Sequence, residues 1–205
     1  MEKLIFLFPR KDGLTREEFF AHYLDVHAPL GLELTRTMTH YTVNLRDRGD
    51  GAAEGVDAIT ETWTESVADF MNPNTSFATP EDAQRLFADH DSFIGAPYDA
   101  YAVDEQVRKG PERLSPGNGV SPGGKAVVAA TGGAALELLG GLLDHDEVTR
   151  YVENRVAAAL MTGAFEPVHA FVEVHLATDG ALAPEIEELV GRGGAVYRVS
   201  EYVKK

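Results

Sequence analysis

Two histidines lie five residues apart in the N-terminal part of the chain, and imidazole is the side chain best suited to proton transfer near neutral pH. They are His22 and His27. On a regular α-helix the two rings would point about 140° apart. Zinc-binding pairs on helices use an i, i+4 spacing that keeps both rings on one face, so this pair should not share a metal ion. We assign both as candidate general acid/base residues and expect no metal site. The alternative is that both satisfy backbone carbonyls at the edge of the core.

A predicted helix must position these histidines. Thr15 and Glu18 form a capping box, in which both side chains accept hydrogen bonds from backbone amides at the start of the helix. Four apolar side chains then fall within a narrow arc that should face the core: Phe19, Tyr23, Val26 and Leu30. Pro29 lacks an amide hydrogen and pushes the preceding residue out of helical geometry, so we expect the helix to end near His27.

A glutamate on a predicted strand is the third candidate acid/base group. In the strand expected over residues 56–63, Glu61 and Trp63 share a face with Ile59. Large apolar neighbours could raise the pKa of the Glu61 carboxyl and suit it to acid/base work. The alternative is an exposed glutamate at the end of a strand. The candidate substrate-binding side chains are Tyr23, Tyr41 and Trp63.

Three other histidines are interpreted as structural. His90, near the end of a second predicted helix, should face solvent together with Asp91. His169 and His175 lie six residues apart on a later strand and should therefore share one of its faces. Sharing a face is necessary for a joint site but does not make one.

The order of predicted elements indicates a ferredoxin-like fold in residues 1–108. Strands are expected over residues 3–8, 39–45, 56–63 and 98–107. One helix should begin at Thr15, and a second at Thr79, which is followed by a proline at the first helical position. The resulting order, β-α-β-β-α-β, is the ferredoxin-like arrangement.

The C-terminal part of the chain repeats this order in shortened form. Residues 109–124 hold three prolines and five glycines and are interpreted as a linker. Beyond it, residues 125–130 resemble the first strand, residues 168–173 match 56–61, and residues 196–205 match 100–109. A helix is expected from Glu147. Residues 155–161 fit either the continuation of that helix or the missing second strand.

We therefore predict an α+β fold of two tandem ferredoxin-like units, residues 1–108 and a degenerate repeat over residues 125–205. Such a unit covers one face of its sheet with helices and leaves the other face bare. Packing the two units sheet to sheet, as an α+β barrel of the dimeric type, would bury both bare faces within one chain.

Composition excludes several classes of partner and site. The formal net charge of −15 would repel phosphate groups, so we expect neither nucleic acid nor membrane surfaces as partners. The chain has no cysteine, which excludes disulfides, thiolate metal sites and a cysteine nucleophile. The apolar run at residues 4–8 is too short for a signal sequence, so a cytoplasmic location is expected.

One motif resembles a known family. Residues 14–19 (LTREEF), followed by His22 and then by residues 25–30 (DVHAPL), resemble the signature of the EthD family, which belongs to the dimeric α+β barrel superfamily. The resemblance covers residues 1–108. Around residues 147–154 of the second half no histidine takes the place of His22 or His27, which implies one site per chain.

The resemblance implies a small-molecule enzyme, because EthD relatives include proteins linked to ether degradation, polyketide dehydratases or cyclases, and muconolactone isomerases. The expected chemistry is proton transfer (dehydration, cyclisation or isomerisation) on a hydrophobic or aromatic substrate, without a cofactor. Monooxygenases and haem-binding proteins of the superfamily make an oxidoreductase, with haem as a conceivable cofactor, the alternative within enzymes. A non-catalytic binding or scaffold module is the alternative outside them. Homo-oligomerisation is compatible with either.

Overall fold

The computed structural model describes residues 1–47, 55–112, 114, 124–163, 167–177 and 194–203. Its strands are β1 (Glu2–Phe8), β2 (Met38–Arg46), β3 (Ala58–Thr64), β4 (Asp99–Lys109), β5 (Lys125–Ala130), β6 (Val148–Met161), β7 (Ala170–Leu176) and β8 (Gly194–Val203). They pair antiparallel in one closed barrel, in the order β1-β3-β2-β8-β5-β7-β6-β4. The fold is therefore an α+β barrel built by one chain.

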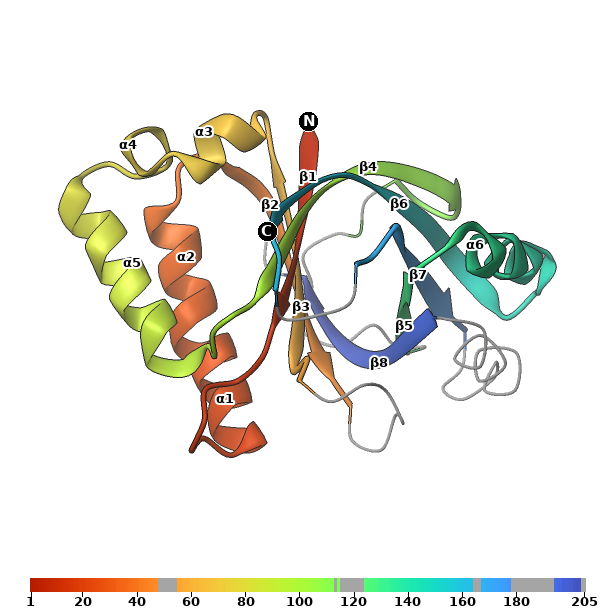
Figure 1. Ribbon diagram of the computed structural model, residues 1–205, viewed down its shortest axis with the longest axis horizontal. Helices are drawn as coiled ribbons and strands as arrows, with labels where there is room; N and C mark the ends of the chain where they lie inside the picture. Colours follow the sequence, from red (N-terminus) through yellow and green to blue (C-terminus); the bar gives the residue numbers. More distant parts are fainter. Residues whose placement is uncertain (48–54, 113, 115–123, 164–166, 178–193, 204–205) are drawn as a thin grey trace.

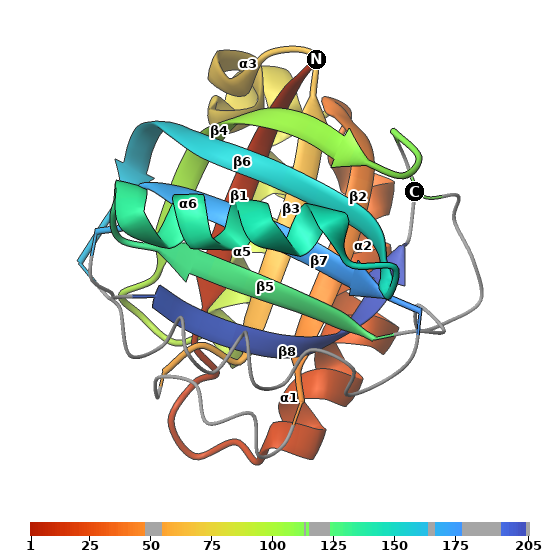
Figure 2. The ribbon, with the colours of Figure 1, turned by 90° about the vertical axis from the view of Figure 1, so that its right-hand side faces the viewer.

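Helices cover the barrel on two sides (Figure 1). The helical segments are α1 (Arg16–His22), the π-helical turn η1 (Tyr23–His27), α2 (Ala28–Leu34), α3 (Val67–Met71), α4 (Pro73–Ser76), α5 (Pro80–Phe93), α6 (Gly133–Gly140) and the 3₁₀ turn η2 (Gly141–Asp144). The α1–η1–α2 segment and α5 form a layer on one side, and α6 lies across β5 and β7 on the other (Figure 2). Among the described helices, none has the length and apolar character needed to cross a membrane.

The element order predicted for residues 1–108 is observed, and the capping box at Thr15 is present with both of its hydrogen bonds. The short helices α3 and α4 were not predicted. The linker predicted for residues 109–124 falls largely outside the described residues, since β4 runs to Lys109 and β5 begins at Lys125.

The prediction that Pro29 ends the first helix is wrong. At η1 the amide of Ala28 donates to the carbonyl of Tyr23, an i→i+5 bond that marks a π-turn. Pro29 then falls in the first turn of α2, where an amide hydrogen is not needed, and the helix continues to Leu34. The wider turn accommodates the proline ring that a regular α-helix would exclude.

The helix predicted from Glu147 is also wrong. Residues 148–161 form the strand β6, which settles residues 155–161 as strand, and the helix of this half is α6, which precedes it. β6 pairs with β4 along one edge and with β7 along the other. These pairings override the helical preference of the Ala157–Met161 sequence, because strand formation depends on the neighbours available.

Side chains alternate between the inside and the outside of the barrel, as the two-residue period of a strand requires. The outward faces of β1, β2 and β3 pack against the α1–η1–α2 segment and α5, and those of β5 and β7 pack against α6. An inner apolar cluster draws on both halves of the chain, with Ile5 and Tyr101 from one and Val127 and Phe171 from the other. The two halves therefore share one interior.

Candidate active site

A cavity of about 200 Å³ lies between the helical layer and the outer face of the sheet. Aromatic and apolar side chains form most of its wall, and polar groups converge on it from two sides. His27 and His90 come from the helices, whereas Tyr41 and Thr60 come from β2 and β3. An apolar cavity with a few convergent polar groups is the usual form of a small-molecule site.

A single carboxylate holds both predicted histidines. Nδ1 of His27 lies 2.8 Å from Oδ2 of Asp89, and Nε2 of His22 lies 2.8 Å from Oδ1 of the same residue. Asp89 belongs to α5, so these contacts also tie α5 to the first helix. His27 lines the cavity, while His22 is 31% exposed and lies behind it.

The π-turn explains why the predicted separation of about 140° is wrong. That angle assumed a regular α-helix. In a π-turn the backbone bonds join residues i and i+5, so residues five apart come roughly one turn apart and share a side of the helix. His22 and His27 are such a pair, and both reach Asp89.

The histidines facing the cavity are held in the neutral form. Burial lowers the pKa of His27, although the hydrogen bond and charge of Asp89 act in the opposite direction. Burial also lowers the pKa of His90 to about 4, with a further contribution from His27. At neutral pH both imidazoles are therefore free of charge and able to accept a proton.

Hydroxyl groups cluster where the helix meets the sheet. The Tyr23 hydroxyl lies 2.6 Å from the Thr60 hydroxyl and 3.3 Å from the Tyr41 hydroxyl. Burial raises the pKa of Tyr23 to about 12 and that of Tyr41 well above its usual 10. Both phenols stay protonated at physiological pH and can donate hydrogen bonds to an oxygen atom of a ligand.

Two predicted site residues lie on the other side of the sheet. Along β3, Thr60 and Thr62 line the cavity, whereas Glu61 and Trp63 point into the barrel. Glu61 is 2.6 Å from Lys125 and 2.7 Å from Lys3, and Trp63 donates to Glu105 at 3.1 Å. Glu61 is thus a buried ion-pair partner and not an exposed residue at a strand end. The structure brings together His22, His27, Tyr23 and Tyr41, but not Glu61 or Trp63.

His90 does not face solvent as predicted. Its ring lines the cavity, 5.7 Å from the ring of His27, and packs edge-on to Phe8 at 5.3 Å. Asp89 was not considered in the sequence. Helical spacing could have found both, because positions 89 and 90 lie between the apolar residues Leu86 and Phe93 on the side of α5 that packs inward.

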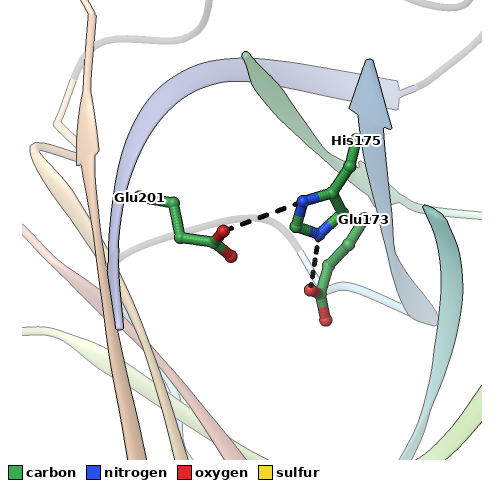
Figure 3. A group of neighbouring side chains, drawn as sticks. All are labelled: Glu173, His175 and Glu201. Atoms are coloured by element: carbon green, nitrogen blue, oxygen red, sulfur yellow. Dashed lines mark ion pairs between the residues drawn. The ribbon is translucent and has the colours of Figure 1, made fainter. Parts of the chain in front are cut away.

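Inside the barrel, Glu173, His175 and Glu201 place donor atoms within 4.8 Å of one another, the kind of group that could hold a metal ion (Figure 3). Protein cations already occupy these donors. Lys125 Nζ lies 2.9 Å from Glu173 and 2.7 Å from Glu201. Arg150 donates to Nε2 of His175 at 3.1 Å, which uses the lone pair a metal would need. We therefore assign this group to a buried ion-pair cluster.

The cavity does not fit haem. Haem carries two propionate carboxylates, which proteins pair with cations, and none of the described residues that line the cavity is a lysine or an arginine. We assign no step to haem.

Gly31→Ala is expected to raise the free energy of unfolding by about 0.5–1 kcal/mol, because a glycine inside a helix costs backbone entropy. Gly31 lies in α2 at the cavity wall, and an added Cβ would be 4.0 Å from Leu86 Cδ1, an ordinary contact. Urea unfolding measures the change. Gly13→Ala is the control: Gly13 has a φ of +90°, so the same substitution there should destabilise the protein.

Comparisons with known proteins agree with this architecture. A family model described as the EthD domain matches residues 11–97. A search of curated proteins finds no match. The solved structure of an anthrone oxidase-like protein aligns with a TM-score of 0.60 at 10% identity, over 98% of this chain and 93% of its own. A candidate monooxygenase from Fusobacterium nucleatum aligns with a TM-score of 0.56 at 8% identity, over 100% and 92% of the two chains.

At these identities the solved structures establish the fold alone. The family match carries more, because it spans the helical wall of the cavity together with His22, His27 and Asp89. Both this match over residues 11–97 and the motif around His22 and His27 make this part of the chain similar to the EthD domain.

Proposed function

We propose that this protein is an enzyme that removes a proton from a hydrophobic, aromatic small molecule bound in the EthD cavity. The observation that carries the proposal is the position of His27, a neutral imidazole that lines an apolar cavity and is held by a carboxylate behind it. Nε2 of His27 would accept a proton from a C–H or O–H group conjugated with a carbonyl. The Tyr23 and Tyr41 hydroxyls would donate hydrogen bonds to the oxygen that gains negative charge.

This chemistry needs no cofactor, and the fate of the resulting anion defines the reaction. Return of the proton at another atom gives isomerisation, loss of a hydroxyl gives dehydration, and attack on a second carbonyl gives cyclisation. We place all three within the proposal, since each begins with the same proton transfer to His27.

Oxidation by dioxygen is the second candidate. It is favoured by the similarity over nearly the whole chain to an anthrone oxidase-like protein. The anion of an anthrone would pass electrons to O₂, so that a CH₂ group and one O₂ become a C=O group and one water. The first step would again be removal of a proton, and His27 would again be the base.

The test uses 1,8-dihydroxyanthrone as the probe, with the full chain. In D₂O without oxygen, NMR should show the protein accelerating deuterium exchange at the anthrone CH₂ group. Admission of air then distinguishes proton transfer alone from oxidation, because an oxidase would consume one O₂ for each quinone formed. Binding of the anthrone without accelerated exchange would contradict base catalysis and favour a non-catalytic binding module.

We further propose that the chain is a tandem repeat of two ferredoxin-like units. The two halves have the same strand order, β4-β1-β3-β2 and β8-β5-β7-β6. Their registers also match: Ile5 pairs with Glu61 as Val127 pairs with Glu173, and Lys3 pairs with Val103 as Lys125 pairs with Val199. The equivalent polar residues are Lys3 and Lys125, Asn44 and Asn154, Glu61 and Glu173, and Glu105 and Glu201, all buried except Glu105, which is partly buried.

The repeat supports one active site per chain. α6 contains no histidine, and its inward side is packed against the strands by Ala135 and Leu139. The second half contributes Met161 of β6, which pairs with Ala100 and lines the cavity of the first half. We infer that the second unit serves to close the barrel and complete the cavity wall.

A further inference from the structure

We propose that Asp89, itself anchored by His22, is a positioning residue that holds the His27 proton on Nδ1 and leaves Nε2 as the proton acceptor toward the cavity. The inference rests on the proposed function for its catalytic meaning, but its structural content can be tested without any substrate.

The hydrogen bonds define the tautomers. An ionised carboxylate can only accept, so each imidazole nitrogen that contacts Asp89 at 2.8 Å must carry a hydrogen. His27 therefore has its proton on Nδ1, and His22 has a proton on Nε2. Nε2 of His27 is left with its lone pair, and His27 is a wall residue of the cavity. A carboxylate behind an imidazole also stabilises the cation that forms when the free nitrogen takes a proton.

Packing shields the Asp89 carboxylate and the His27 ring from most of the solvent. The ring of Phe93 lies 4.6 Å from the ring of His22 and 4.8 Å from the ring of His27. The side chain of Asp89 is 13% exposed and that of His27 is 9% exposed. Hydrogen bonds to a shielded carboxylate are stronger than the same bonds in water, so they can fix a tautomer. Other titratable groups near His27 are Tyr23 on its own helix and His90 on α5.

The π-turn is the backbone feature that makes the arrangement possible. In a regular α-helix the rings of His22 and His27 would point about 140° apart. The i→i+5 bond from Ala28 to Tyr23 brings them to one side. π-turns are uncommon and often found at functional sites. Here the turn lets the half-exposed His22 bind the same carboxylate that orients His27.

Nitrogen-15 NMR of the full-length protein at neutral pH reads the tautomers directly. In the wild-type protein we expect the Nδ1–H form for His27 and the Nε2–H form for His22. A His27 that carries its proton on Nε2 would overturn the inference, whatever the activity of the protein.

Asp89→Asn tests the role of the carboxylate. The amide has one oxygen, so it can accept from only one of the two histidines and must present N–H to the other. We expect at least one histidine to change tautomer and kcat for the anthrone exchange to fall on the order of 10²-fold. Asp91→Asn, an exposed residue on the same helix, is the matched control and should change neither tautomer.

Variants at His22 test whether its hydrogen bond to Asp89, and not only the volume of its ring, fixes the tautomer of His27. His22→Gln keeps an N–H donor near the position of Nε2, so it should retain the Nδ1–H form of His27, whereas His22→Leu should loosen it. Unchanged spectra of both histidines in Asp89→Asn, together with an unchanged His27 spectrum in His22→Leu, would overturn the proposal. A tautomer change without any loss of activity would leave the positioning role intact and contradict the proposed function of His27 instead.

Discussion

Replacing His27 with glutamine is expected to lower the rate of deuterium exchange into 1,8-dihydroxyanthrone by about 10²–10⁴-fold, the usual contribution of a general base. The glutamine amide fills similar space and can still contact Asp89, but it has no nitrogen lone pair that accepts a proton at neutral pH. Because the anthrone would still meet the aromatic wall, its affinity should change much less than kcat.

His169→Gln is the matched control for this variant. His169 is exposed, immediately before β7, and does not line the cavity, so its replacement should leave the exchange rate unchanged. A His27→Gln protein that folds normally and retains the wild-type rate would exclude His27 as the base. His90 would then be the other imidazole of the wall to test.

The pH dependence of the exchange rate should also identify His27 as the base. Burial lowers the pKa of His27 below its usual 6.5, against the opposing effect of Asp89. The base works only in its neutral form, so the rate should rise with pH through a midpoint below 6.5 and stay level through neutrality. A midpoint above 6.5 would show that the Asp89 charge outweighs burial.

Lys125→Met is expected to destabilise the protein by about 3–5 kcal/mol, the cost of removing one partner from a buried ion-pair group. The Lys125 ammonium is fully buried and lies 2.6 Å from Glu61, 2.9 Å from Glu173 and 2.7 Å from Glu201. The methionine would fill the space but leave these carboxylates with one close cation fewer. Such a loss is a large part of the 5–15 kcal/mol that stabilises a typical domain.

Urea unfolding at neutral pH measures the effect, with Lys11→Met as the control. Lys11 is exposed and donates to the backbone carbonyl of Asp91, so its replacement should cost little. The double variant Lys125→Met/Glu201→Gln removes a cation together with an anion and should recover part of the loss. Equal, small losses for Lys125→Met and Lys11→Met would contradict a stabilising role for the cluster.

The same buried ion-pair cluster predicts how the free energy of unfolding changes with pH. Burial acts to raise the pKa of Glu173, but the Lys125 and Lys3 ammonium groups hold it well below the ordinary 4.5. Below pH 4.5 the unfolded state therefore binds more protons than the folded state, and the stabilisation is lost as pH falls. The pKa values of Lys3 and Lys125 are raised above 10.5, so the stabilisation that these lysines contribute is lost only as pH rises beyond that value. Glu173→Gln should flatten the acid side of this profile.

Local patterns in the sequence were enough for much of the first half. The capping box at Thr15, the proline after Thr79 and the alternation of β3 depend on neighbouring residues only, and the structure has all three. The family motif around His22 and His27 is also local, and the domain match confirms it. Helix caps and strand alternation can be predicted from the sequence because the interactions that determine them involve residues only a few positions apart.

The face of a strand could be predicted, but not what would lie opposite it. Glu61 and Trp63 share a face as expected, yet that face lies inside a barrel closed by the second half of the chain. The carboxyl that might have been an acid/base group instead meets Lys3 and Lys125, the latter 64 positions away along the chain. Pairing also made β6 a strand against its local helical preference.

The sequence by itself determined which residues could transfer a proton and that two of them stand five positions apart on a helix. Only the tertiary structure decided that both rings contact one carboxylate. Asp89 lies 62 positions from His27, and it reaches both rings because α5 packs beside a π-turn whose wider spacing brings the pair to one side. The angle between two residues on a helix depends on its hydrogen-bond register, and here that register is a π-turn within an otherwise α-helical segment.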